Sequence, residues 1–213
     1  ISSGANLGAA VAIVAVSGAM ATVATGAFLG GLLAVAMVML LVRATRSLST
    51  STYVLAGIII SAVANAMIML LKYYADSDSE LAAIEYWTMG SLASVTASKV
   101  LTILPFWLVG FGGLLLLHRQ VGLLSLNEEE CRMLGVRLRP IRRVILLLST
   151  LLVSSVVSVT GLISFTGLIA PHIARVMIRR QNTQTMVLSA LVGALVLLIA
   201  DILARSLYAA ELP

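Results

Sequence analysis

The chain has little charge and almost no cysteine or histidine. Asp, Glu, Lys and Arg make up 11% of its 213 residues, whereas a soluble domain carries about 25%. The single cysteine, Cys131, excludes an internal disulfide. The histidines are only His118 and His172, and no group of histidine, cysteine and carboxylate has metal-ligand spacing. We therefore expect no metal site and no cofactor.

Two further absences bear on chemistry and targeting. The sequence has no glycine–lysine loop of the kind that cradles phosphates, so it offers no ATP-hydrolysing site of that kind. It has no basic start followed by a short apolar core, so we expect no signal peptide. Because it begins with Ile1, we also expect these residues to be part of a longer gene product.

Long uncharged runs dominate what remains. The chain is 60% hydrophobic, its first charge is Arg43, and residues 144–174 carry none. A membrane-crossing helix needs roughly 20 apolar residues, and such runs would leave a soluble helix no polar face. They also lack the alternation of barrel strands. The sequence predicts an all-α polytopic bundle, one transmembrane domain over 1–213, with segments at about 3–19, 21–42, 52–74, 98–118, 142–162, 164–178 and 186–207.

Two of these segments have expected irregularities. The first and second share one uncharged run, and the small residues Ser17-Gly18-Ala19 are the expected turn between them. The sixth is short, so we expect a broken or half-length helix, which membranes tolerate inside protein or beside a cavity.

The loops between the segments alternate between basic and acidic. Basic residues gather in loops 43–51, 119–141 and 179–185, whereas loop 75–97 carries four carboxylates. The positive-inside rule places the three basic loops in the cytoplasm and the acidic loop outside. This orientation accounts for the net charge of +5 without nucleic acid as a partner. The outer loop is long enough for a short surface helix, with Tyr86 and Trp87 at the headgroup level.

One cytoplasmic stretch holds a third of all the charge. Residues 126–143 contain eight charged side chains. Asn127 is a suitable helix N-cap, the following glutamates suit the positive end of the helix dipole, and Gly135 is a suitable terminator. Pro140 then suits the first turn of another helix. The stretch is either a solvated connection or a docking surface for a cytoplasmic partner.

Small and polar residues recur at four-residue spacing within the apolar segments. Gly57, Ser61 and Asn65 form one such stripe, which serves either close helix packing or a wet wall of a pathway. Gly4-x-x-x-Gly8 and Gly26-x-x-x-Gly30 are predicted to be packing motifs. 

Asp201 and Arg205 lie four apart on one helix face, near the end of an apolar segment. Charge there is costly and usually faces protein or water. The pair serves either to fix helix packing or a specific use outside the membrane.

Several stretches share a pattern with one family of transporters. They are Leu55-Ala56-Gly57, Trp87-Thr88-Met89-Gly90-Ser91, the loop from Leu126 to Gly135, Gly167-Leu168-Ile169-Ala170-Pro171-His172-Ile173-Ala174-Arg175, and Ala200-Asp201-Ile202-Leu203-Ala204-Arg205 with Glu211-Leu212-Pro213. Across essentially its full length the chain resembles the FecCD-like permeases of type II ABC importers for iron–siderophores, haem and vitamin B12. One departure is Arg179-Arg180-Gln181-Asn182, where family members often have Gly, Asp, His and Arg.

The resemblance implies an architecture and a set of partners. It implies a ten-helix permease, of which about seven helices, the third to the ninth, are present here. The permease works as a homo- or heterodimer in a bacterial or archaeal plasma membrane. Two cytoplasmic ATP-binding subunits and an extracytoplasmic substrate-binding protein complete the importer. The permease carries out no covalent chemistry.

The resemblance also implies roles for particular residues. Loop 119–141 would couple to the ATPase through Leu126, Asn127, Glu128, Glu129, Cys131, Arg132, Leu134 and Gly135, with Cys131 an inert thiol. Arg205 would dock the binding protein, and Gly57, Ser61 and Asn65 would line the translocation path. A structural motif would comprise Gly167, Pro171, His172, Arg175 and Asp201. There we expect Pro171 to bend the backbone and His172 to hydrogen-bond a freed carbonyl.

Two other functions remain open at this point. A proton-coupled secondary transporter would use Asp201, His172 and Arg205 as relay groups. It would need a pH gradient and no ATPase. A membrane-embedded hydrolase is disfavoured, because it needs a nucleophile near a base and the chain has only two histidines. The sequence does not name the cargo.

Overall fold

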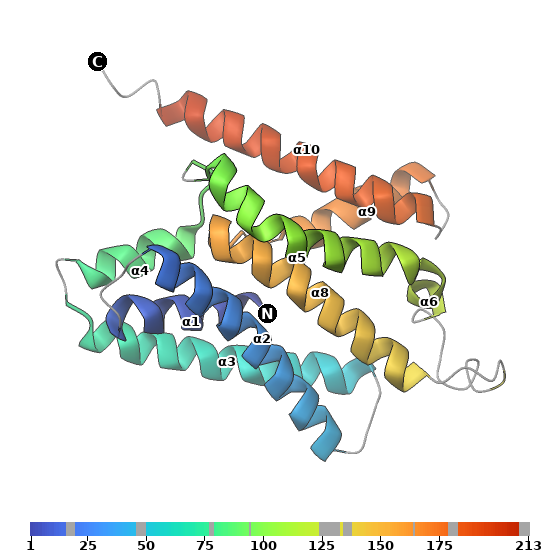
Figure 1. Ribbon diagram of the computed structural model, residues 1–213, viewed down its shortest axis with the longest axis horizontal. Coiled ribbons are helices and arrows are strands. Elements are labelled where there is room, and N and C mark those ends of the chain that lie inside the picture. Colours follow the sequence, from blue (N-terminus) through green and yellow to red (C-terminus); the bar gives the residue numbers. More distant parts are fainter. Residues whose placement is uncertain are drawn as a thin grey trace. The chain divides into compact units, whose positions relative to one another are not determined.

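Every regular element that the structure describes is a helix (Figure 1). The computed structural model describes residues 1–15, 20–45, 50–76, 79–93, 95–123, 133, 138–163, 165–178 and 183–208. The helices are α1 (Ser2–Ala15), α2 (Met20–Ala44), α3 (Thr50–Tyr74), α4 (Glu80–Met89), α5 (Ala97–Leu116), α6 (His118–Leu123), α8 (Leu138–Thr160), α9 (Thr166–Ile178) and α10 (Thr183–Tyr208). The predicted all-α fold is confirmed.

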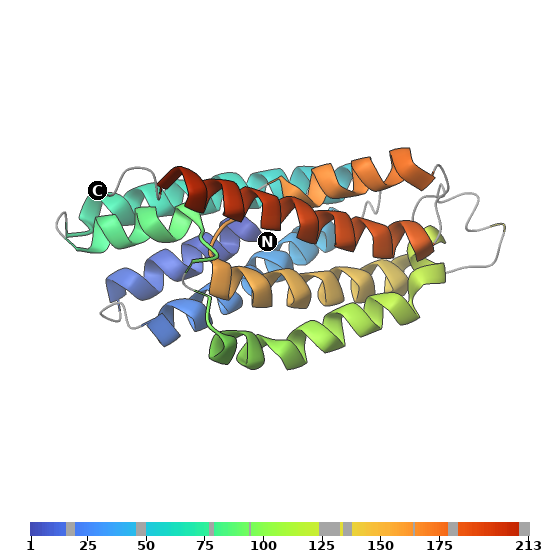
Figure 2. The same cartoon turned by 90° about the horizontal axis from the view of Figure 1, so that it is seen from above.

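The helices fall into two compact units. Unit 1 comprises residues 1–162 and holds α1 to α8, and unit 2 comprises residues 163–213 and holds α9 and α10. In unit 1, α5 (green) and α8 (orange) lie side by side (Figure 2), and α2 (blue) crosses α3 (teal) at an angle (Figure 1).

Five helices are long and apolar enough to cross a membrane. They are α2, α3, α5, α8 and α10, within which the candidate spans have 20 to 24 residues. Each corresponds to a predicted segment. The spans are largely unburied within the chain, from 0% of the most apolar window in α10 to 28% in α2 and α8. Their apolar surfaces therefore face lipid or other protein, as in an integral multi-pass membrane protein.

Two of the predicted apolar segments appear as helices shorter than a crossing. The predicted sixth segment appears as α9, with 13 residues, about 20 Å at 1.5 Å per residue, against a hydrocarbon core of about 30 Å. Its predicted half length is confirmed. The first segment appears as α1, with 14 residues ending at Ala15. The predicted turn at residues 17–19 lies outside the described part of the chain.

Helix α1 forms the centre of unit 1. It packs on α2, α3, α4 and α8, and it buries mostly small side chains, including Ala5, Ala9 and Ala10. At its crossing with α2, a Cβ added to Gly26 would lie 2.6 Å from the carbonyl oxygen of Gly8. Real Cβ atoms do not approach backbone oxygen so closely, so only glycine fits. The two predicted packing motifs are confirmed.

The predicted surface helix of loop 75–97 is α4, and it is anchored at its middle and near its end. Lys72 Nζ at the end of α3 lies 2.6 Å from Glu85 Oε1. The Thr88 hydroxyl donates a 3.1 Å hydrogen bond to Asn6 Oδ1 on α1. Tyr86 is exposed as predicted, whereas Trp87 is half-buried and packs against the core of unit 1. Loop 75–97 thus contains a helix that side-chain contacts fix to α1 and α3.

Two glycines, Gly90 after α4 and Gly161 after α8, bring the ends of these helices together. Gly90 and Gly161 adopt φ angles of 67° and 71°, which L side chains rarely adopt. A Cβ on Gly90 would lie 2.6 Å from Leu162 O, and one on Gly161 would lie 2.6 Å from Trp87 O. The backbones therefore touch, and Ser91 N donates a 2.8 Å hydrogen bond to Thr160 O.

Unit 2 is a helical hairpin. Helix α9 packs on α10 and buries Ala170 and Ala174. The close approach uses small residues, because a Cβ on Gly193 of α10 would lie 3.4 Å from Ala170 Cβ. Pro171 lies inside α9, where it removes one backbone donor from the helix.

Candidate functional site

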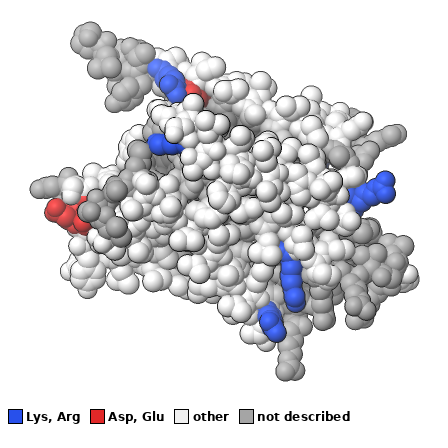
Figure 3. All heavy atoms as spheres, viewed as in Figure 1, with Lys and Arg blue, Asp and Glu red and all other residues white. Residues whose placement is uncertain are grey.

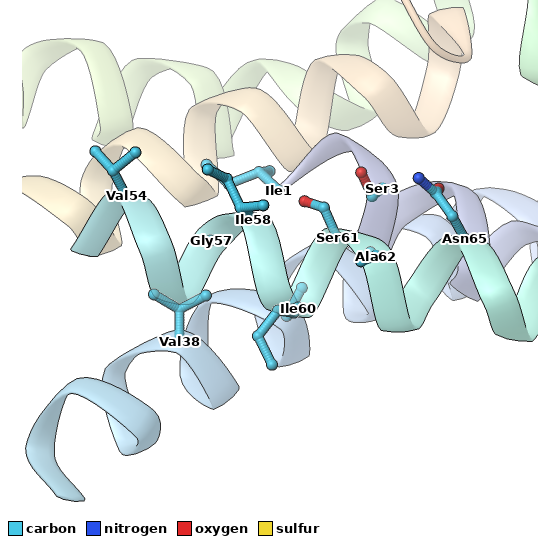
Figure 4. Close-up of a pocket in the computed structure, with 12 residues that line it drawn as sticks. Ile1, Ser3, Val38, Val54, Gly57, Ile58, Ile60, Ser61, Ala62 and Asn65 are labelled. Atoms are coloured by element: carbon cyan, nitrogen blue, oxygen red, sulfur yellow. The ribbon is translucent and has the colours of Figure 1, made fainter. Parts of the chain in front are cut away.

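A cavity of about 500 Å³ lies between α1, α2 and α3 and is lined by the predicted stripe. Gly57, Ser61 and Asn65 contribute to its wall from α3, and Ser3 contributes from α1. Figure 4 shows the side chains of Ser61 and Asn65 on the same side of α3, with Ser3 close by. The remaining lining is mainly aliphatic, from residues such as Val38. The cavity is thus an apolar hollow with a few polar groups along one helix.

The surroundings of Gly57 bear on the two interpretations of the stripe. A Cβ added to Gly57 would have no neighbour within 4 Å, whereas Gly26 touches backbone directly. Helix α3 packs on α1 and α2, and the side chains that it buries are those of Ala56, Ala64 and Ile68. Close packing among the described residues therefore does not explain Gly57, which leaves packing against other protein or the wall of a pathway as its use.

A second cavity, of about 620 Å³, was not foreseen from the sequence. It lies within unit 1 and is lined by residues of α1, α2, α4, α5 and α8 and the loops beside α4 and α8. Aromatic side chains, among them Phe28, Trp87 and Phe106, give it an apolar wall. Its lining residues are far apart in the sequence and share no spacing, so no sequence signal could have found it.

The predicted coupling residues lie outside the described part of the chain. This holds for Leu126, Asn127, Glu128, Glu129, Cys131, Arg132, Leu134 and Gly135. The structure does describe the flanks of their loop, α6 before it and α8 after it. In α8, the Arg142 guanidinium carbon lies 5.2 Å from the ring centroid of Tyr53 on α3. Sequence analysis missed this pair.

The described acidic side chains of unit 1 gather at one end, where the basic Lys72 pairs with Glu85. Figure 3 shows basic side chains toward the end where α2 finishes and α6 and α8 have their charged termini. It shows acidic side chains at the other end, beside α4. Arg43 lies in the last turn of α2, Arg119 in α6 and Arg142 in α8, whereas Glu80 and Glu85 lie in α4. The folded unit thus has the charge asymmetry from which the sequence predicted its orientation.

Asp201 and Arg205 form the ion pair that their spacing predicts. Arg205 Nε donates a 2.8 Å hydrogen bond to Asp201 Oδ2. The Arg205 side chain is 60% exposed and that of Asp201 is 24% exposed. Only one guanidinium nitrogen is used in this bond, and Arg donates from three. The pair therefore holds Arg205 in place while leaving donors for another partner.

One expectation for α9 is wrong. His172 was expected to hydrogen-bond a carbonyl freed by Pro171, but its ring makes no hydrogen bond among the described residues and the residue is exposed. The reason is its register, because α9 turns Ala170 and Ala174 toward α10 and leaves His172 and Arg175 on exposed faces. The two side chains are not brought together with Asp201 by any contact within unit 2 that the structure describes.

Comparisons with known proteins agree with this architecture. The model of the FecCD transport family matches residues 1–213. The molybdate import system permease protein MolB of Haemophilus influenzae is 34% identical over 75% of this chain and 48% of its own length. The hemin transport system permease protein HmuU of Yersinia pestis is 38% identical over 88% of this chain and 56% of its own. The chain thus spans about half the length of these curated relatives.

A solved structure shows the same fold. It is described as an inward-facing conformation of a metal-chelate type ABC transporter, and it is 33% identical with a TM-score of 0.89. The match covers 100% of this chain and 68% of that one.

Proposed function

Because the chain belongs to the FecCD transport family, we propose that it is the membrane-spanning permease part of an ATP-driven importer. The strongest support is the match of the whole chain to an ABC transporter structure at a TM-score of 0.89. The cavity beside Gly57, Ser61 and Asn65 suits such a role, because one wall is open and carries polar groups. The permease itself makes and breaks no covalent bond.

The proposed cargo is a metal chelate such as an iron–siderophore, haem or vitamin B12. The relatives' names point to bulky or oxyanionic metal compounds, with hemin in one case and molybdate in another. The described residues contain no group of three or more His, Cys, Asp or Glu that could hold a bare metal ion. A cargo whose metal is already wrapped needs only a wall of suitable shape, such as an apolar hollow.

The proposed partners are those of an ABC importer, as membership of the FecCD transport family suggests. ATP-binding subunits would grip loop 119–141 at the basic end, and the substrate-binding protein would dock at the opposite side of the membrane. A second permease subunit would complete the pathway. Closure of the ATPase dimer would push the loop, tilt α6 and α8 with it, and alternate the access of the cavity. A conformational change of this kind requires only that each state binds its partner differently.

We expect ATP-dependent uptake when the full-length permease is reconstituted with its ATPase and binding protein. Proteoliposomes would be offered ferric desferrioxamine, hemin, cyanocobalamin and molybdate in turn, and internalised metal or cobalamin would be measured. Uptake of at least one probe should require hydrolysable ATP and stop when the ATPase is catalytically inactive. Uptake driven by a pH gradient without ATPase would instead support the proton-coupled transporter.

Replacing Arg205 by glutamine should weaken docking of the binding protein by about tenfold, because an exposed charge pair is lost from the rim of an interface. The affinity of the purified binding protein for the reconstituted permease would be measured at low and high salt. Arg43→Gln is the matched control, since it removes an exposed arginine from the predicted cytoplasmic side. Equal affinity in Arg205→Gln and Arg43→Gln would refute the docking role and leave helix packing as the use of the pair.

A further inference from the structure

Tyr53 and Arg142 connect two helices whose main packing partners differ. The 5.2 Å separation between the Arg142 guanidinium carbon and the Tyr53 ring centroid is within the range of a cation–π contact, about 6 Å. Both residues are half-buried, so water screens the contact only in part. Helix α3 packs mainly on α1 and α2, whereas α8 packs mainly on α5 and α2. Both helices pack on α2, and the contact adds a direct side-chain connection between them.

Each residue stands at a place where movement would matter. Arg142 lies one turn after Leu138, where α8 begins on leaving loop 119–141. Tyr53 lies in the first turn of α3, four residues before Gly57, and so continues the spacing of Gly57, Ser61 and Asn65. The pair thus lies between the loop and the helix face that lines the cavity.

We propose that the Arg142–Tyr53 pair, called here the clasp, transmits movement of loop 119–141 to α3. This rests on the proposed function, in which an ATPase pushes the loop. A push on the loop reaches the first turns of α8, and Arg142 then carries the base of α3 with it. A guanidinium over an aromatic ring suits this task, because the two groups attract each other without needing one exact hydrogen-bond geometry. Without the clasp, α8 would move and α3 would lag behind.

The test reads the movement of α3 without needing a known cargo. Ser61→Cys places a reporter thiol in the cavity wall, and its rate of labelling by N-ethylmaleimide is measured in the full-length permease assembled with its ATPase. Labelling is compared with and without ATP and vanadate, and the parent lacking the engineered cysteine supplies the background. We expect nucleotide to change the rate severalfold when the clasp is intact.

Variants of the clasp separate transmission from stability. Tyr53→Leu and Arg142→Gln should each abolish the nucleotide response, and the double variant should be no worse than either, because the contact is lost once. Tyr53→Phe keeps the ring and should keep the response. Arg143→Gln, which removes the exposed arginine next along the chain, should also keep it. ATP hydrolysis should continue in all of these complexes, because the ATPase is unaltered.

The possible outcomes are distinct. A full nucleotide response in both Tyr53→Leu and Arg142→Gln would overturn the clasp and leave the ATP-driven importer standing. A lowered thermal midpoint with an unchanged response would also overturn it, since the contact would then only stabilise the fold. No response with Tyr53 and Arg142 intact, while ATP is hydrolysed, would overturn the proposed ATP drive and the clasp with it.

Discussion

Replacing Gly26 by leucine is expected to prevent correct packing of α1 on α2. Even the Cβ of alanine at this position would lie 2.6 Å from Gly8 O and 2.8 Å from Ala12 Cβ. One neighbour is backbone and cannot rotate away, so the helices must separate and lose contacts along the whole crossing. Within membranes such contacts are a main source of helix association. We expect Gly26→Ala to cost roughly 3 kcal/mol, the upper end for overpacking, and Gly26→Leu to cost more than the fold can tolerate.

The measurement is the yield of monodisperse permease after detergent extraction, followed by its thermal midpoint. Gly112→Ala is the matched control, because a Cβ on Gly112 of α5 would have no neighbour within 4 Å. Since alanine has the higher helix propensity, by about 1 kcal/mol, Gly112→Ala should be neutral or stabilising. If Gly26→Ala and Gly112→Ala unfold at the same temperature, the close crossing does not hold unit 1 together.

The helices could be predicted from the sequence because their signal is local. The uncharged run that precedes Arg43 contains α1 and nearly all of α2. The sixth apolar segment is short in the sequence, and α9 is correspondingly short. The glycine packing motifs are local too, since Gly26 and Gly30 must lie on one face of one helix. The ion pair of Asp201 and Arg205 could be predicted for the same reason.

The contacts between distant segments could not be predicted. The Asn6–Thr88 hydrogen bond joins residues 82 positions apart. The sequence around either residue gives no sign that the other is its partner. The approach of Gly90 to Gly161 and the contact of Arg142 with Tyr53 could not be predicted for the same reason, because each joins residues far apart in the sequence. The helical period indicates which face of a helix is apolar, but the packing of the whole unit decides which faces of two helices meet. His172 was mispredicted for a related reason, because its exposure depends on the face that α9 turns toward α10.

Replacing Arg132 by proline is expected to abolish ATP-driven uptake while leaving the permease in the membrane. The sequence predicts a helix that Asn127 caps and Gly135 ends, so residue 132 is an interior position. Proline there removes a backbone hydrogen bond and clashes with the preceding turn, at a cost of about 3 kcal/mol or more. A loop without its helix cannot carry the push of the ATPase to α8. Uptake should fall to the level of vesicles without ATPase, and ATP hydrolysis should become independent of cargo.

The matched control uses the same substitution two residues earlier, in the first turn of the predicted helix. Glu130 lies in the first turn, where the backbone donor has no partner within the helix to lose and proline is tolerated. Glu130→Pro should therefore retain most of the uptake, although it replaces a charged residue of the same loop. Both variants should insert and extract like the parent, because the loop lies outside the apolar segments. Equal loss of uptake in both would mean that loop charge, rather than a helix, makes the connection to the ATPase, and uptake retained by Arg132→Pro would remove the coupling role from this loop altogether.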